Sequence, residues 1–535
     1  MNRTVRMAIV AAVLLLSCCC PGISAGETQA SKPNILFIAV DDLRPELGCY
    51  GRDYIKSPNI DRIARGGMVF NRAYCQQAVC SPTRSSLMTG TRPDTTKVWD
   101  LVTHFRKALP DVVTLGQHFK QNGYFVQGMG KIYHGGYDDP ATWSVPWQNP
   151  RAVAYALREN LILNQRQFAG EPDGDRPGKK GVARTGPNSR GPAFESADVS
   201  DDTYTDGKVA SLAVETLGEL SHKSAPFFLA VGFVKPHLPF VSPKKYWDLY
   251  DPAKIVLATN KFRPRNAPDY AVLPGGEMRS YHGIPPGSIP DDLARQLKHG
   301  YYAAISYMDA QVGKVLDELD RLGLRKNTII ILWGDHGWKL GEHDAWCKHS
   351  NVENDVNAPL ILSVPGMKNA GARSDALVEY VDIYPTLSEL AGLPLPAHLE
   401  GISFKPLLEN PKQPWKSAAF SQYPRTKGAS GGLSLMGYSM RTDRYRFTEW
   451  VSRKNPSEVD AVELYDHVTD PQENENIAGR PESAVLVKEL SARRKAGWQA
   501  APPPASRQEA PRSDALMLHS AKGSRSFPLG SHRSA

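Results

Sequence analysis

Three clusters of polar side chains each follow a run of apolar residues, and their side chains are of the types that bind metal ions or move protons. The clusters are Asp41-Asp42, Lys235-Pro236-His237 and Asp335-His336. Carboxylate oxygens suit hard divalent cations, and an imidazole can bind a metal or act as an acid or base. Alone, Asp41-Asp42 would indicate only a turn or helix cap at a strand end. Because all three clusters follow apolar runs, we expect them to form one site.

A further candidate is Cys80, which begins the segment Cys80-Ser81-Pro82-Thr83-Arg84. Pro82 fits the first turn of a helix. Cys80 should then lie just before a helix N-terminus, where backbone N–H groups and the helix dipole favour an anion. Arg84 would lie about one turn further on, close to the same end. On this pattern alone, a buried and unreactive thiol is an equally good interpretation.

The elements that must position these residues alternate along the chain. The apolar runs 34–40, 226–233 and 328–333 are continuous, which is typical of strands buried in a parallel sheet. Helical patterns cover 206–220 and about 291–322. This alternation predicts a mostly parallel sheet with helices on both faces. Ligands of such sheets bind beyond the carboxyl ends of the strands, where all three polar clusters fall.

Other parts of the chain have less regular patterns. The stretches 165–202 and 261–290 are rich in Gly, Pro, Asn and charge, and loops of this length are uncommon unless they are functional or disordered. Alternation near 445–450 predicts hairpins in a smaller C-terminal subdomain, and the Ser-, Arg- and Pro-rich end has the composition of a disordered tail. The expected divisions are a catalytic domain at 32–425, a subdomain at 426–500 and a tail at 501–535.

The bulk composition excludes some classes of protein. The formal net charge is +8, but the basic residues form no stripe or run, so we do not expect a nucleic-acid partner. A mildly basic enzyme suits a polyanionic substrate. The chain has seven cysteines. Three of them lie at 18–20, in the segment that resembles a signal peptide, which leaves four. Four cysteines predict no disulfide framework for a chain of this size, and their spacing predicts no zinc site.

The first residues have the pattern of a secretory signal peptide, 1–25, with an apolar run over 7–16 and small residues ending at Ala25. The apolar run is too short for a good membrane span, and no later stretch is long and apolar enough. We therefore expect a secreted or periplasmic protein. The sequence before Cys18 also resembles the lipobox of bacterial lipoproteins, so a lipid anchor at Cys18 is a minor alternative.

The segment from Cys80 to Gly90 resembles the signature of the sulfatase family, Cys-x-Pro-Ser-Arg followed by Leu-Thr-Gly, in which the cysteine is oxidised to formylglycine. Thr83 stands where the family most often has Ser, and Met88 where it usually has Leu. Further family motifs follow at 130–134, 235–237, 335–337, 380–386 and 463–466. Within the family, the similarity is greatest to the iduronate-2-sulfatase group, which has His at position 336 where many sulfatases have Asn.

The resemblance implies an alkaline-phosphatase-like α/β fold, a three-layer sandwich with a mostly parallel sheet and a smaller C-terminal α+β subdomain. It also implies hydrolysis of sulfate esters of a sulfated sugar or polysaccharide. The metal ligands would be Asp41, Asp42, Asp335 and His336, completed by a formylglycine oxygen at position 80. Oxygen ligands suit Ca²⁺, whereas the nitrogen ligand leaves Mg²⁺ or a transition metal open.

The resemblance also implies the catalytic roles. The hydrated formylglycine made from Cys80 would attack sulfur and form a covalent sulfated enzyme. The other implied roles are these: Arg84 steadies the formylglycine, Lys131 and Lys348 bind sulfate oxygens, His237 protonates the leaving oxygen, and His134 takes the proton of the second hydroxyl. Lys348 is chosen over His349 because it aligns with the family lysine.

The implied partners are a sulfated carbohydrate and the enzyme that generates formylglycine. Two other functions remain open from the sequence. Relatives on this fold cleave phosphate esters, so a phosphate mono- or diester hydrolase is one alternative. The second alternative is a catalytically silent carbohydrate-binding protein, which the chain would be if Cys80 were never oxidised.

Overall fold

The structure is a computed structural model that describes residues 32–166, 190–427 and 433–504. The predicted signal peptide, Cys18 and most of the predicted tail lie outside the described residues, as does part of the stretch 165–202.

The centre of the molecule is a seven-stranded sheet in which β1, Asn34–Val40, lies between β10, Thr328–Gly334, and β7, Phe227–Phe233. Both neighbours run parallel to β1, and β4, Phe125–Gly130, continues the parallel part beyond β7. Every residue of the three central strands is buried, which explains why their sequences are continuously apolar. The three predicted strands and the mostly parallel sheet are confirmed.

The opposite edge of this sheet is mixed. There β11, Leu360–Ser363, pairs antiparallel with β10, and β2, Met68–Phe70, pairs antiparallel with β11. The edge strand β12, Arg373–Ser374, runs parallel to β2.

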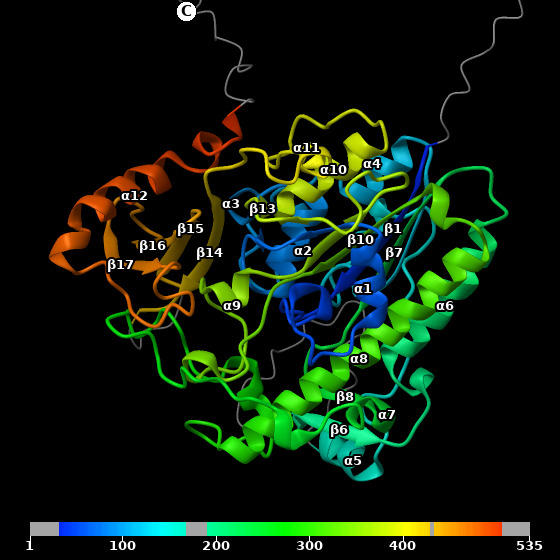
Figure 1. Ribbon diagram of the computed structural model, residues 1–535, viewed down its shortest axis with the longest axis horizontal. Helices are drawn as coiled ribbons and strands as arrows, with labels where there is room; N and C mark the ends of the chain where they lie inside the picture. The colour runs from blue at the N-terminus through cyan, green and yellow to red at the C-terminus, as the bar shows by residue number, and fades with distance from the viewer. Residues whose placement is uncertain (1–31, 167–189, 428–432, 505–535) are drawn as a thin grey trace, which may run out of the picture.

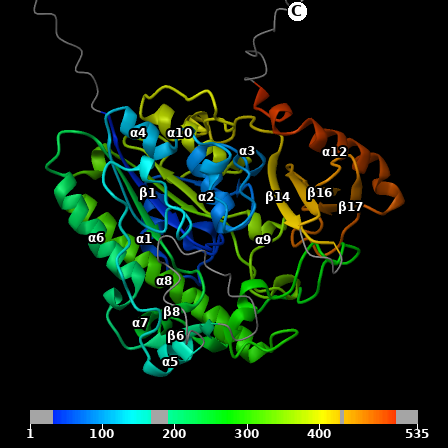
Figure 2. The same ribbon diagram turned by 180° about the vertical axis from the view of Figure 1, so that it is seen from behind.

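Two helical layers cover the sheet, and alternate residues of β1 point into each. Leu36, Ile38 and Val40 pack into the core beneath one layer, which contains α1 (Pro58–Arg65), α6 (Thr205–Leu220) and α8 (Asp291–Arg321). Ile35, Phe37 and Ala39 pack into the core beneath the other, which contains α2 (Cys80–Thr89), α4 (Leu115–Gln121) and α10 (Ile383–Leu390). Figure 1 and the reverse view in Figure 2 show these layers. The predicted three-layer sandwich and both predicted long helices are confirmed.

A four-stranded antiparallel sheet forms the C-terminal part, at the side of the main sheet in Figure 1. Its strands are β14 (Ala419–Arg425), β15 (Leu435–Arg441), β16 (Tyr445–Ser452) and β17 (Val459–Asp466). Helix α12, Ala484–Ala496, packs Leu490 onto this sheet. The hairpin predicted near 445–450 is confirmed. Since β14 already belongs to this sheet, the expected division at 425 falls after its first strand, and the domain division stays a prediction.

The chain between β4 and β10 also forms two small parallel pairs. These are β5 (Arg190–Pro192) with β9 (Tyr281–His282), and β6 (Phe194–Ala197) with β8 (Phe240–Pro243). The other short elements are β3 (Ala73–Tyr74), β13 (Val378–Glu379), α3 (Pro93–Thr96), α5 (Arg158–Arg166), α7 (Lys244–Trp247), α9 (Glu353–Val356) and α11 (Lys405–Glu409). Among the described residues, none of the helices combines the length and the apolar character that crossing a bilayer requires.

Candidate active site

The polar clusters that follow β1, β7 and β10 meet at one edge of the sheet, because these strands are parallel and neighbouring. The backbone N–H of Asp41 donates to the carbonyl of Phe233 at 3.2 Å, and that of Asp335 donates to the carbonyl of Val40 at 2.9 Å. The N–H of Asp42 donates to Asp335 Oδ1 at 3.0 Å. The sheet therefore brings the predicted clusters together at its carboxyl edge.

Asp42 turns the chain sharply at the end of β1. Its φ is 57°, in the left-handed region that non-glycine residues rarely adopt. The hydroxyl of Tyr301, on α8, donates to the Asp42 carbonyl at 2.8 Å. The side chains of both Asp41 and Asp42 are fully buried.

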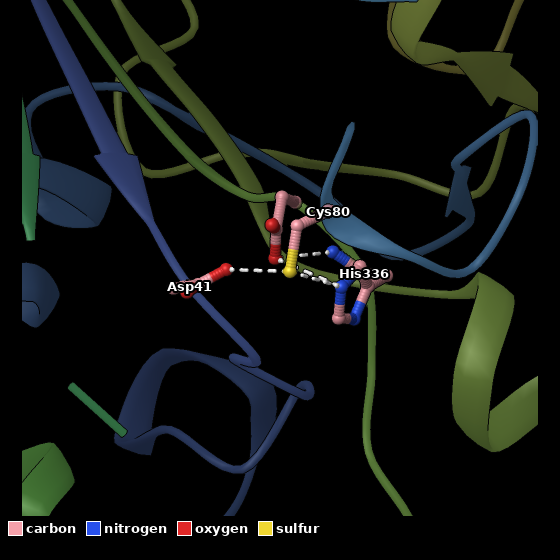
Figure 3. A group of neighbouring side chains, drawn as sticks. Asp41, Cys80 and His336 are labelled. Atoms are coloured by element: carbon pink, nitrogen blue, oxygen red, sulfur yellow. Dashed lines mark hydrogen bonds and ion pairs between the residues drawn. The ribbon is translucent and has the colours of Figure 1, made fainter. Parts of the chain in front are cut away.

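The ring of His336 has a defined orientation. Its Nδ1 lies 3.0 Å from the Gly337 carbonyl, so Nδ1 carries the hydrogen and Nε2 is left as the ligand atom. Nε2 lies 3.5 Å from Cys80 Sγ and 3.5 Å from Asp42 Oδ1. Figure 3 shows Asp41, Cys80 and His336 pointing toward one another.

Cys80 is the first residue of α2, with Val79 as the N-cap and Pro82 in the first turn. The sequence pattern predicts Cys80 just before the helix, whereas in the structure the helix begins at Cys80 itself. Its Sγ donates to Asp41 Oδ1 at 3.3 Å. Burial and the negative charge of Asp41 raise the pKa of the Cys80 thiol well above its usual value. The unmodified side chain is therefore a neutral thiol and lacks the nucleophilicity of a thiolate.

The acidic residues have the arrangement of a cation site. Ligand atoms of Asp41, Cys80, Asp335 and His336 all lie within 4.8 Å of one another. Two buried carboxylate oxygens, Asp41 Oδ2 and Asp42 Oδ1, have only lysine ion pairs, with Lys131 Nζ at 2.5 Å and Lys348 Nζ at 3.1 Å. Burial and the charge of Asp41 also raise the pKa of Asp335 to about 7. A divalent cation would offset the mutual repulsion of these carboxylates.

Arg84 links three parts of the site from a completely buried position on α2. Its Nε donates to Asp335 Oδ2 at 2.9 Å, and its Nη2 donates to Asp41 Oδ1 at 3.2 Å. Its Nη1 donates to the carbonyls of Lys131 and Ile132. The guanidinium thus holds α2 against the ends of β1, β4 and β10.

Two lysines carry positive charge to the carboxylates. Lys131 follows β4 directly, and its Nζ lies 2.5 Å from Asp41 Oδ2. The Nζ of Lys348 lies 3.1 Å from Asp42 Oδ2 and 4.9 Å from the ring centre of Trp338. His349, the neighbouring candidate, instead places its Nδ1 3.3 Å from Cys347 Sγ.

Two histidines complete the predicted set. The Nε2 of His237 lies 3.8 Å from Asp42 Oδ2, while its Nδ1 lies 2.6 Å from the Leu238 carbonyl. His134 lies three residues after Lys131 in the sequence. Its Nδ1 is buried without a hydrogen-bond partner. Burial lowers the pKa of His237 to about 3, although Glu277 opposes the shift. Burial and the charge of Lys131 lower the pKa of His134 to about 3.

Glu277 also lies in the site and was not predicted. It belongs to a 3₁₀ helix, Gly276–Ser280, just before β9. Its Oε2 accepts from Lys348 Nζ at 2.9 Å and lies 3.6 Å from His237 Nε2, while its Oε1 accepts from Arg190 Nη1 at 2.6 Å. The one sequence signal was the length of the irregular stretch 261–290, in which no motif singles out this residue.

Comparison with known protein families gives two matches. The model of the family described as "Sulfatase" matches residues 33–393. The model described as "N-sulphoglucosamine sulphohydrolase, C-terminal" matches residues 341–497. Among curated proteins, iduronate 2-sulfatase of Homo sapiens is 35% identical over 553 residues, which cover 89% of this chain and 97% of that protein.

Solved structures give a consistent fold. One, of a protein in complex with its substrate D-glucosamine-2-N,6-O-disulfate, has a TM-score of 0.65 at 21% identity and covers 87% of this chain and 99% of its own. A phosphonate monoester hydrolase from Silicibacter pomeroyi has a TM-score of 0.68 at 21% identity and covers 88% of this chain and 96% of its own. At such identities the likeness concerns the fold alone, which is the alkaline-phosphatase-like sandwich that the family resemblance implies.

Proposed function

Because the chain belongs to the sulfatase family and is a sulfuric ester hydrolase, we propose that it removes the sulfate of a 2-sulfated uronic acid in a sulfated carbohydrate. One observation carries the proposal: Cys80, at the N-terminus of α2, lies beside a buried set of possible metal ligands and two lysines. The identity to iduronate 2-sulfatase over most of both chains supports the uronic acid as the sugar.

Asp41, Asp42, Asp335 and His336 would hold the cation, for which we propose Ca²⁺, with Mg²⁺ as the alternative. A hydrated formylglycine at position 80 would supply the attacking hydroxyl, and the cation would draw negative charge from the sulfate oxygens. The closeness of buried carboxylates supports the cation, and the place of Cys80 among the ligand atoms supports the role of position 80.

The remaining task of the protein is to neutralise and orient an anionic ester. Lys131 forms an ion pair with Asp41, and Lys348 forms one with Asp42. Each lysine would bind sulfate oxygens of the substrate. Arg84 would fix the side chain at position 80 through the carboxylates that it already contacts. Glu277 would hold Lys348 in place from the side of β9.

Proton transfer falls to the two histidines. The pKa of about 3 leaves His134 neutral, which is the state in which it would accept the proton of the second hydroxyl. His237 presents Nε2 and would protonate the leaving oxygen. Its pKa is also low in the free site, and the negative charge of a bound sulfate ester would raise it.

Sulfate release from defined substrates tests the proposal. The panel contains 2-sulfated uronic acid disaccharides from heparan and chondroitin, a 6-sulfated glucosamine, and ulvan, fucoidan and carrageenan fragments. We expect the highest kcat/KM for a 2-sulfated uronic acid. Matched sulfate and phosphate esters of one alcohol test the reaction itself, and a preference for phosphate would overturn it.

Secretion, a signal peptide ending at Ala25 and maturation of Cys80 by a formylglycine-generating enzyme also belong to this proposal. Support comes from the secretory pattern of residues 1–25 and from the signature at Cys80, with Thr83 and Met88 as variant positions. Mass spectrometry of the Cys80 peptide should show sulfur and two hydrogens replaced by one oxygen. The Cys80→Ala variant should still bind substrate and release no sulfate, so appreciable turnover would refute the nucleophile.

A further inference from the structure

His237 lies on the segment Val234–Pro239, whose backbone is held by two buried charged side chains. These are Asp206, in the first turn of α6, and Lys235 itself. Neither has a role among the reacting groups described above. Buried charges are costly, and apolar residues of similar volume often replace them without loss of stability. Their presence beside His237 therefore requires an explanation.

Asp206 fixes the point where the chain leaves β7. Its Oδ1 accepts from the N–H of Val234 at 2.8 Å, and its Oδ2 accepts from the N–H of Lys235 at 2.8 Å. One carboxylate on a helix thus binds two successive N–H groups just beyond the strand. This fixes the direction in which the segment continues toward His237.

Lys235 fixes the other end of the segment. Its Nζ turns back and donates to the carbonyl of His237 at 2.9 Å and to that of Pro239 at 2.6 Å. Burial lowers the pKa of Lys235 to about 8, although the charge of Asp206 opposes the shift. The ammonium therefore pays a desolvation cost that its two carbonyl partners offset in part.

The backbone of this segment also determines how the ring is presented. The carbonyl of Leu238 lies between the two carbonyls that Lys235 binds, and it is the partner of His237 Nδ1 at 2.6 Å. A shift of this backbone would turn the ring and move Nε2. We propose that Asp206 and Lys235 are positioning residues that hold His237 Nε2 in line with the leaving oxygen.

This inference rests on the proposed role of His237, and it predicts a dependence on the leaving group. A sugar alkoxide leaves poorly unless it is protonated, whereas 4-nitrophenolate leaves without help. Lys235→Met should lower kcat/KM by about 10- to 100-fold for the sugar sulfate that the wild type cleaves best. The same variant should change kcat/KM for 4-nitrophenyl sulfate by less than about 3-fold, because protonation is not needed there.

A double-variant cycle separates positioning from general structural support. In a His237→Gln background, Lys235→Met should cause no further loss on the sugar sulfate, since it acts through the missing ring. Lys245→Met, which removes an exposed lysine that pairs with Asp201, is the matched control. It should leave kcat/KM for both substrates unchanged. If Lys235→Met does not fold, Asp206→Asn takes its place in the same measurements.

Equal losses on both esters, or additive losses in the double variant, would overturn the positioning role. A wild-type enzyme that releases no sulfate from any sugar, or that prefers phosphate esters, would instead refute the proposed function. The two failures are therefore distinguishable.

Discussion

A partly buried ion pair, Arg44 with Glu342, should make the stability of the protein depend on pH. Glu342 accepts from Arg44 Nη1 at 2.9 Å and from the N–H of Leu340 at 2.6 Å. Burial alone would raise the pKa of Glu342, but the charge of Arg44 lowers it to about 2. Since this pKa is depressed on folding, its contribution to stability is present above the unfolded value and is lost as pH falls through the folded value.

Replacement of Glu342 by Gln should therefore destabilise the protein in a pH-dependent way. We expect a loss of about 3 kcal/mol at pH 7, and less than half of that by about pH 3. Thermal unfolding of both proteins between these pH values measures the difference. Glu458→Gln, at an exposed position, should show little difference at either pH. A gap in unfolding temperature that stays constant with pH would contradict the assignment.

At the scale of elements, the sequence was informative where a strand is long and buried on both faces. The runs at β1, β7 and β10 could be predicted for this reason, and their parallel order brought Asp41, His237 and Asp335 together. The mixed edge could not be predicted, because strands as short as β2 and β12 carry no periodic signal. Nor could Glu277, which reaches Lys348 only through the packing of an irregular segment.

The turn after β4 is one place where the backbone of an element determines the position of a site residue. Gly130 has a φ of 66°, and a Cβ there would lie 2.1 Å from the Gly232 carbonyl oxygen. We expect Gly130→Ala to lower the free energy of unfolding by about 2–5 kcal/mol, because backbone strain and overpacking add. It should also lower kcat/KM, because Lys131 is displaced from Asp41.

Gly123→Ala is the matched control for this prediction. Gly123 has a φ of 88°, but a Cβ there would have no atom within 4 Å. Its replacement should cost only the strain of about 1–2 kcal/mol and leave kcat/KM unchanged. Denaturant unfolding and sulfate release measure both variants. Equal effects on activity would show that the close approach of β4 and β7 does not position Lys131.

At the scale of the whole molecule, the charge of the site depends on the cation. Four cationic side chains balance four carboxylates: Arg84, Lys131, Lys348 and Arg190 against Asp41, Asp42, Asp335 and Glu277. A divalent cation would make this group positive, which favours an anionic sulfate ester. Away from this site, the described residues contain a second group with metal-ligand spacing, Glu353, His467 and Glu473. There, however, Arg446 Nε already lies 2.5 Å from Glu473 Oε1, and its Nη2 contacts Glu353.

The response to added cation should therefore come from the first group. A ligand that binds only the folded state stabilises it by about 2.7 kcal/mol at 100 times its Kd, so Ca²⁺ added after chelation should raise the unfolding temperature. Asp42→Asn should abolish this rise, because it removes a negative ligand. His467→Gln should retain it, since Arg446 satisfies the carboxylates of the second group. If His467→Gln lost the rise in unfolding temperature and Asp42→Asn kept it, the cation would have to be assigned to the second group.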